Sequence, residues 1–145
     1  MVLNIIKGFT ISLIMMQSVF ANEQAIIGNW INAEGDGIIE ITLAKTKYVG
    51  TIIGTPDPIH NGRKDTKNPD QKLRDRLLEG LTILKGFSYQ EENLWSGGTI
   101  YDPNTGKTYK CKLSLNDDGT LKVRGYVGIS LFGRTVVRRQ NLLDR

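Results

Sequence analysis

The sequence predicts an all-β fold, a small antiparallel meander β-barrel with one short helix, from two observations. Apolar and polar residues alternate along most of the chain after residue 21, which is typical of strands with one buried face. Glycine-containing turns separate these segments every eight to twelve residues or so. About eight or nine strands result, and closing such a sheet into a barrel removes its exposed edges.

The first 21 residues are typical of a secretory signal peptide. Lys7 precedes an apolar run over residues 8–20, and Ala21 suits cleavage before Asn22. The run is shorter than the roughly 20 apolar residues that cross a bilayer. We therefore expect residues 22–145 to form one periplasmic or secreted domain, with no stable membrane span after cleavage.

Three strands are predicted before residue 54, each from local alternation of apolar residues. Turns at residues 34–37 and 45–46 separate these strands, because glycine and aspartate favour tight turns in the first of them. The expected strands cover residues 27–32, the alternating Ile39, Ile41 and Leu43, and residues 48–53.

A polar loop and a short helix are expected next. The polar run over residues 60–70 contains almost nothing able to enter a core. Asn68 before a proline resembles a helix start, so we predict a helix from about Pro69 to Leu78. Leu73 and Leu77 would then share one face of it, four residues apart. A further strand is predicted over residues 81–87.

Two turns set the register of the following strands. A four-residue loop after Asp102 pairs Asp102 with Lys107, and a three-residue loop at residues 117–119 pairs Leu115 with Leu121. Both registers place one set of side chains on the same face, which we predict as the core. That set is Ile100, Tyr109, Cys111, Leu113, Leu115, Leu121, Val123 and Val127. A last strand is expected near residues 134–139.

The opposite face of these strands is predicted to be basic and aromatic. Lys112 lies directly across from Arg124, and two like charges across a strand pair are unfavourable unless they are solvated or matched by an anion. A solvated face is the ordinary outcome for such charges. The candidate interaction residues on this outer face are Trp95, Lys110, Lys112, Arg124 and Tyr126.

Composition excludes several function classes. The only histidine, His60, has no partner in a recognisable nucleophile motif, so we do not predict an enzyme. Too few histidines and cysteines are present for a zinc site, and we expect no metal and no cofactor. The net charge of +4 is too small to indicate a nucleic-acid partner. Cys111 alternates with apolar residues and is predicted to be a buried, inert thiol.

A better candidate site lies in the loop and the predicted helix, above one mouth of the barrel. Arginine there could bind a carboxylate or phosphate group through two parallel hydrogen bonds. In the structural alternative, Arg74 pairs with Asp70 one helical turn earlier while Asn68 caps the helix. The candidate ligand-binding residues are Asp65, Asn68, Arg74, Arg76 and Tyr109.

Three segments together resemble a bacterial exported family known as domain of unknown function 2147. They are residues 28–30, residues 65–81, and residues 95–109 with their continuation through residues 125–128 and 133–134. The resemblance covers most of residues 22–145. It implies a periplasmic or secreted barrel of the lipocalin (calycin-like) type.

Gly28 and Trp30 also resemble the Gly-x-Trp signature that opens lipocalin sequences. That resemblance implies that Trp30 packs across the closed end of the barrel, beneath a basic side chain of the last strand. Arg138 and Arg139 are both candidates for this basic residue. A buried tryptophan stabilises the fold through its large apolar area, so this signature is interpreted as structural.

Two functions are compatible with these features. The first is a non-enzymatic exported barrel that binds a small amphipathic or hydrophobic, lipid-like ligand, which predicts an apolar cavity of about 300 Å³ or more. The alternative is a filled barrel that acts as an envelope interaction module. It would bind a protein, peptidoglycan or anionic lipid through its basic and aromatic outer face, and salt would weaken that binding.

Overall fold

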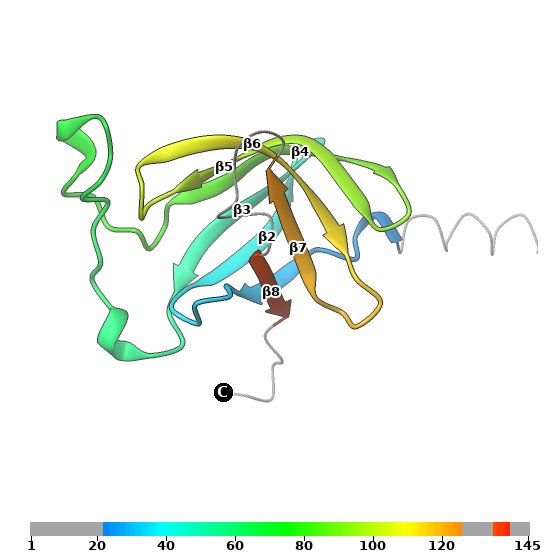
Figure 1. The fold of residues 1–145 in the computed structure, drawn as a ribbon, viewed down its shortest axis with the longest axis horizontal. Helices are drawn as coiled ribbons and strands as arrows, with labels where there is room; N and C mark the ends of the chain where they lie inside the picture. Colours follow the sequence, from blue (N-terminus) through cyan, green and yellow to red (C-terminus); the bar gives the residue numbers. More distant parts are fainter. Residues whose placement is uncertain (1–21, 126–134, 140–145) are drawn as a thin grey trace, which may run out of the picture.

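A computed structural model describes residues 22–125 and 135–139, the latter by their backbone only. In this part of the chain, eight strands form a closed antiparallel barrel in which each strand pairs with the next and β8 returns to β1 (Figure 1). The strands are β1 (Gly28–Ile31), β2 (Ile38–Ala44), β3 (Lys47–Gly54), β4 (Thr82–Glu91), β5 (Leu94–Asp102), β6 (Lys107–Leu115), β7 (Leu121–Gly125) and β8 (Thr135–Arg139). The predicted all-β meander barrel is confirmed. The predicted signal peptide, Tyr126 and Val127 lie outside the described residues.

The hairpin registers derived from the turns are confirmed. Asp102 pairs with Lys107, Leu115 with Leu121, and Lys112 with Arg124. Gly106, with φ 71°, supplies the positive φ that closes the β5–β6 turn. Local turn chemistry therefore fixes these two hairpins.

The predicted core face is confirmed where it is described. Ile100, Cys111, Leu113, Leu121 and Val123 are buried, while Tyr109 and Leu115 are partly buried and pack against the same cluster. Burial raises the pKa of the Cys111 thiol to about 12, so the thiol stays protonated and unreactive.

The prediction that Trp95 lies on the outer face is wrong. Trp95 pairs with Leu113 and Gly98 pairs with Cys111, so two residues of β5 face one residue of β6 in between. Gly97 has φ 81°, as expected for a β-bulge that uses glycine. The extra residue reverses the alternation of β5, and Trp95 is fully buried in the core.

The helix predicted over residues 69–78 is also wrong. Only one 3₁₀ turn, η2 (Gln71–Leu73), forms there, and Asp70 rather than Asn68 caps it by accepting a hydrogen bond from the Lys72 amide at 3.0 Å. Leu73 and Leu77 are 37% and 52% exposed, so they do not form a buried helix face.

The segment folds back on itself instead of continuing as a helix. The Asp65 amide donates to the Arg76 carbonyl at 3.0 Å, and the Leu78 amide donates to the Arg63 carbonyl at 2.9 Å. In a helix, the Arg76 carbonyl and the Leu78 amide would each bond to a backbone group four residues away. Here both bond to residues 63–65 instead. A second 3₁₀ turn, η1 (Pro58–His60), precedes them. We call the connection over residues 55–81 the strap.

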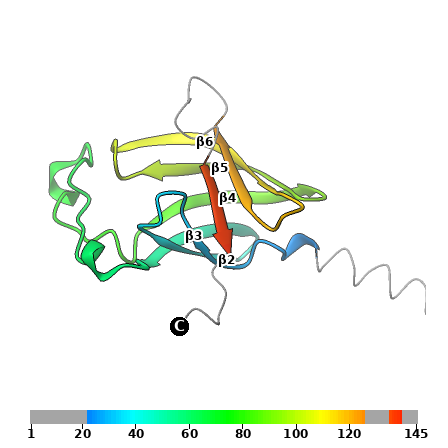
Figure 2. The ribbon, with the colours of Figure 1, turned by 60° about the horizontal axis from the view of Figure 1, so that its bottom comes forward.

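One end of the barrel is filled by aromatic side chains. Trp30 and Trp95 are buried there, and the N-terminal segment 22–27 closes this end. Trp30 Nε1 donates to the Ile26 carbonyl at 2.9 Å, while Trp95 Nε1 and the Tyr48 hydroxyl both donate to the Glu23 carbonyl at 3.2 and 2.7 Å. The strap lies at the opposite end, beside the β5–β6 hairpin, in both views (Figures 1 and 2).

Candidate functional site

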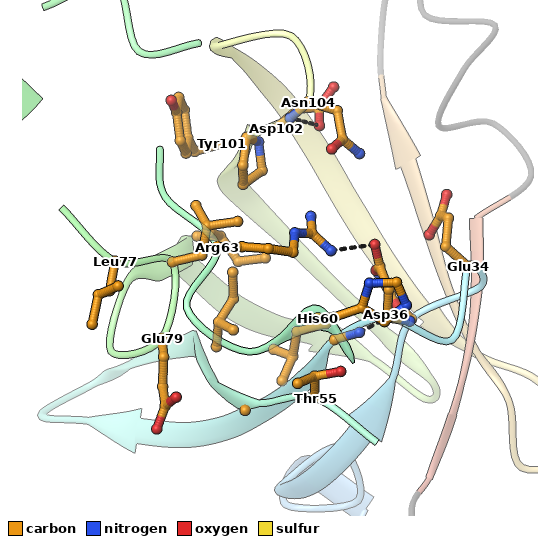
Figure 3. A pocket seen from close by; sticks show the side chains of 18 of the residues that line it. Glu34, Asp36, Thr55, His60, Arg63, Leu77, Glu79, Tyr101, Asp102 and Asn104 are labelled. Atoms are coloured by element: carbon orange, nitrogen blue, oxygen red, sulfur yellow. Dashed lines mark hydrogen bonds and ion pairs between the residues drawn. The ribbon is translucent and has the colours of Figure 1, made fainter. Parts of the chain in front are cut away.

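A cavity of about 130 Å³ opens at the strap end of the barrel. Four isoleucines, one from each of β2 to β5, line its floor: Ile39, Ile52, Ile83 and Ile100. The wall is formed by the β1–β2 loop, by strap residues 55, 60–63 and 77–79, and by residues 101–104 at the end of β5 (Figure 3). The volume is below the expected 300 Å³, because the large aromatic side chains fill the other end of the barrel.

An ion pair joins two loops at the rim of this cavity. Arg63 of the strap donates from Nη1 to Oδ2 of Asp36 in the β1–β2 loop, and Figure 3 shows Arg63 extending to Asp36 with His60 nearby. Asn32 holds Asp36 in place, since its Nδ2 donates to Asp36 Oδ1 at 2.7 Å and its Oδ1 accepts from the Asp36 amide at 3.0 Å. Burial raises the pKa of Asp36, but the bonds from Asn32 and Arg63 outweigh it and lower that pKa.

Asp102 brings a further carboxylate to the cavity wall. It is only 7% exposed and lies two residues after Ile100, on the same face of β5. Its Oδ1 accepts from the Asn104 amide at 3.0 Å and its Oδ2 accepts from the Thr105 hydroxyl at 2.7 Å. Among the described side chains no cation forms an ion pair with it.

Behind the cavity wall, a buried polar cluster ties the strap to β5. Asp65 is fully buried, and its Oδ1 accepts from the Tyr101 hydroxyl at 2.5 Å. Its Oδ2 accepts from Asn68 Nδ2 at 2.8 Å and from Arg76 Nε at 2.9 Å and Nη2 at 2.8 Å. We call Asp65, Asn68, Arg76 and Tyr101 the strap anchor. Such a network is stable because every buried polar atom in it has a partner.

Two pKa shifts describe the strap anchor. Burial raises the pKa of Asp65, but hydrogen bonds from Tyr101, Asn68 and Arg76 outweigh it, so the pKa falls below its ordinary value. Burial and the bond to the Asp65 carboxylate raise the pKa of Tyr101 to about 12. At neutral pH, therefore, Asp65 is an anion and Tyr101 a hydrogen-bond donor.

Four of the five predicted ligand-binding residues come together, but they bind one another. Asp65, Asn68 and Arg76 belong to the strap anchor, and Arg74 Nε donates to the Asn68 carbonyl at 2.8 Å rather than to Asp70. None of the four lines the cavity. Tyr109 lies on β6 opposite Ile100 and packs against the core.

Sequence reasoning missed the contact of Tyr101 with the strap. The contact joins residues 36 positions apart, so no local pattern marks it. The structure adds a second reason for Gly106 beyond its turn: a Cβ there would lie 1.9 Å from the Lys67 carbonyl oxygen, so the hairpin packs directly on the strap backbone. A glycine required by a close neighbour indicates such packing.

The outer face keeps only part of its predicted set. Lys110 and Arg124 are exposed, Lys112 is half-buried across from Arg124, and Trp95 lies inside the barrel. No acid forms an ion pair with these three cations within residues 22–125.

At the closed end, Gly28 begins β1, and the register distinguishes the two candidate arginines. Trp30 pairs with Arg139, whereas Arg138 pairs with Ile31. By backbone register, therefore, Arg139 rather than Arg138 lies across from Trp30.

Neither metal-binding nor membrane-spanning features are found in the described segments. No group of three or more His, Cys, Asp or Glu side chains there could hold a metal ion. No helix in the same residues is long and apolar enough to cross a bilayer.

Comparisons with known proteins agree with the fold. No curated protein matches the chain. A solved structure, titled as protein HP1028 from the human pathogen Helicobacter pylori belonging to the lipocalin family, superposes with a TM-score of 0.71 at 23% identity, over 82% of this chain and 85% of that one. The model of domain of unknown function 2147, described as an uncharacterized protein conserved in bacteria, matches residues 28–139. The chain therefore belongs to the domain of unknown function 2147 family and has a lipocalin-like barrel.

Proposed function

We propose that this protein is a non-enzymatic barrel that binds a small amphipathic ligand in the cavity beneath the strap. The observation that carries the proposal is an isoleucine floor below a polar rim, at the end of the barrel that the described aromatic side chains do not fill. Ligand sites in proteins are concave and mainly apolar with a few placed polar groups. The interior of an eight-stranded barrel is wide enough either to be filled by side chains or to hold one small ligand.

The cavity volume limits the size of the apolar part of the ligand. An engineered apolar cavity of about 150 Å³ takes up benzene, so a cavity of about 130 Å³ suits a group of roughly that size. A long acyl chain would not fit wholly inside this volume. We further propose that the protein acts in the cell envelope, in keeping with the signal-like residues 1–21.

A neutral aromatic probe tests this proposal. Benzyl alcohol binding to the purified protein is measured by NMR titration, in the original chain and in two variants at neighbouring positions of β3. Ile52→Phe fills the cavity floor, whereas Ile53→Phe makes the same change at an exposed position that does not line the cavity. We expect saturable binding that Ile52→Phe removes and Ile53→Phe keeps. No binding to the original chain, or binding unaffected by Ile52→Phe, contradicts the proposal.

A second candidate function rests on the outer face. Lys112 and Arg124 lie directly opposite each other, an arrangement that an anionic partner would relieve. An envelope module would use these cations, with Lys110, to bind anionic lipid, peptidoglycan or an acidic protein. Vesicles with anionic lipid should then bind at low salt and release at high salt. Binding that persists in the Lys112→Ala/Arg124→Ala double variant refutes this face.

A further inference from the structure

The charges that line the cavity have the opposite sign to the whole chain. Among the described residues, four acids (Glu34, Asp36, Glu79 and Asp102) and one arginine (Arg63) line it, which gives these residues a formal charge of −3 with His60 neutral. The chain as a whole carries +4. A cleft lined by one sign of charge attracts ligands of the opposite sign.

Arg63 is not available as a receptor for an anion. Its guanidinium is paired with Asp36, and Asn32 holds that carboxylate in position. A carboxylate ligand would have to displace Asp36 and leave it part-buried without its cation, which is unfavourable. Arg74 and Arg76 do not line the cavity, because they bind within the strap and its anchor.

Asp102 supplies a carboxylate where the apolar floor meets the rim. It follows Ile100 on the same face of β5, so a ligand whose apolar group rests on Ile100 brings its polar head toward Asp102. Both of its oxygens accept hydrogen bonds from neutral donors, and no described cation pairs with it. A carboxylate oxygen has a second lone pair that can accept a donor from a ligand.

We infer that the cavity selects a small amphiphile with a cationic or hydrogen-bond-donating head, such as a primary ammonium, and discriminates against carboxylates. The inference rests on the proposed function and adds the chemical class of the ligand. The apolar group occupies the isoleucine floor, and the head lies beside Asp102 with Glu34 and Glu79 at the rim.

Three probes of matched size test this selectivity at pH 7 and low salt. Benzylammonium, benzyl alcohol and benzoate share one aromatic ring and differ in head charge. We expect benzylammonium to bind about tenfold more tightly than benzoate, with benzyl alcohol between them, from one charge interaction at a partly solvated rim. Isothermal titration calorimetry measures the three dissociation constants.

A matched pair of variants assigns the effect to one carboxylate. Asp102→Asn keeps the shape and an acceptor for the Asn104 amide, whereas Asp118→Asn makes the same change in the β6–β7 turn, where Asp118 Oδ1 accepts from the Thr120 amide and hydroxyl. Asp102→Asn should reduce the benzylammonium-to-benzyl alcohol affinity ratio several-fold. Asp118→Asn should leave that ratio unchanged.

The outcomes separate this inference from the proposed function. Benzoate binding as tightly as benzylammonium overturns the charge selectivity, while the cavity remains a binding site. An affinity ratio that Asp102→Asn does not change overturns the role of Asp102. Failure of all three probes to bind overturns the proposed function as well.

Discussion

Removing one hydroxyl from the strap anchor should destabilise the barrel measurably. In Tyr101→Phe, Asp65 Oδ1 loses the donor that lies 2.5 Å away, and Asp65 is fully buried, so water cannot replace it. A hydrogen bond to a charged group contributes about 1.5–3 kcal/mol. Because Asn68 and Arg76 continue to bind Asp65, we expect a loss near the lower end, about 2 kcal/mol.

Urea unfolding measures this loss, and Tyr89→Phe is the control. Tyr89 packs edge-on against Trp95 at 5.6 Å between ring centroids, and no hydrogen bond of its hydroxyl is found within the described residues. With a urea slope of roughly 1–3 kcal/mol per molar, Tyr101→Phe should lower the midpoint by about 1 M, and Tyr89→Phe should change it little. If both variants unfold at the same midpoint, the anchor does not hold the strap as argued.

Three further predictions concern packing and pH. Gly106→Ala should destabilise the fold by about 1–3 kcal/mol more than Gly35→Ala. Both glycines have positive φ, but only at Gly106 would a Cβ meet the strap backbone. Equal unfolding midpoints for the two variants would contradict the close packing. Trp95→Ala should lower the free energy of unfolding by about 3–5 kcal/mol, since Trp95 is fully buried. A loss below about 0.5 kcal/mol would indicate instead that Trp95 is exposed. The carboxylate of Asp65 stabilises the fold above its ordinary pKa of 3.8, and this contribution is lost as pH falls through the lower pKa of the folded state. Asp65→Asn should therefore flatten the fall in unfolding free energy below about pH 4, and an unchanged acid profile would refute that role.

The hairpins could be predicted because their determinants are local. Asp102 and Gly106 fix one turn, and the register then follows residue by residue along both strands. Trp95 was misplaced because the bulge at Gly97 adds one residue, after which simple alternation assigns the wrong face. The adjacent Gly97 and Gly98 were a sign of such a bulge.

The strap and the cavity depend on contacts that a local pattern does not contain. Asn68 has the sequence context of a helix cap, and its Oδ1 does accept from the Asp70 amide at 2.9 Å. Its Nδ2, however, donates to the Asp65 carboxylate and the Tyr101 hydroxyl, and no α-helix follows. Long-range burial and hydrogen bonding thereby override local helix signals. The acidic lining of the cavity likewise arises only where the β1–β2 loop, the strap and the end of β5 meet.

The measurement that most directly tests the central claim is a map of amide chemical-shift changes on titration with benzyl alcohol. If the ligand binds beneath the strap, the largest changes should fall at Ile39, Ile52, Ile83 and Ile100, which line the floor of the cavity. Small changes are expected around Trp30 and Trp95 at the filled end. If the largest changes fall at that filled end, or if no changes occur at saturating probe, the ligand does not bind in the cavity beneath the strap and the central claim is contradicted.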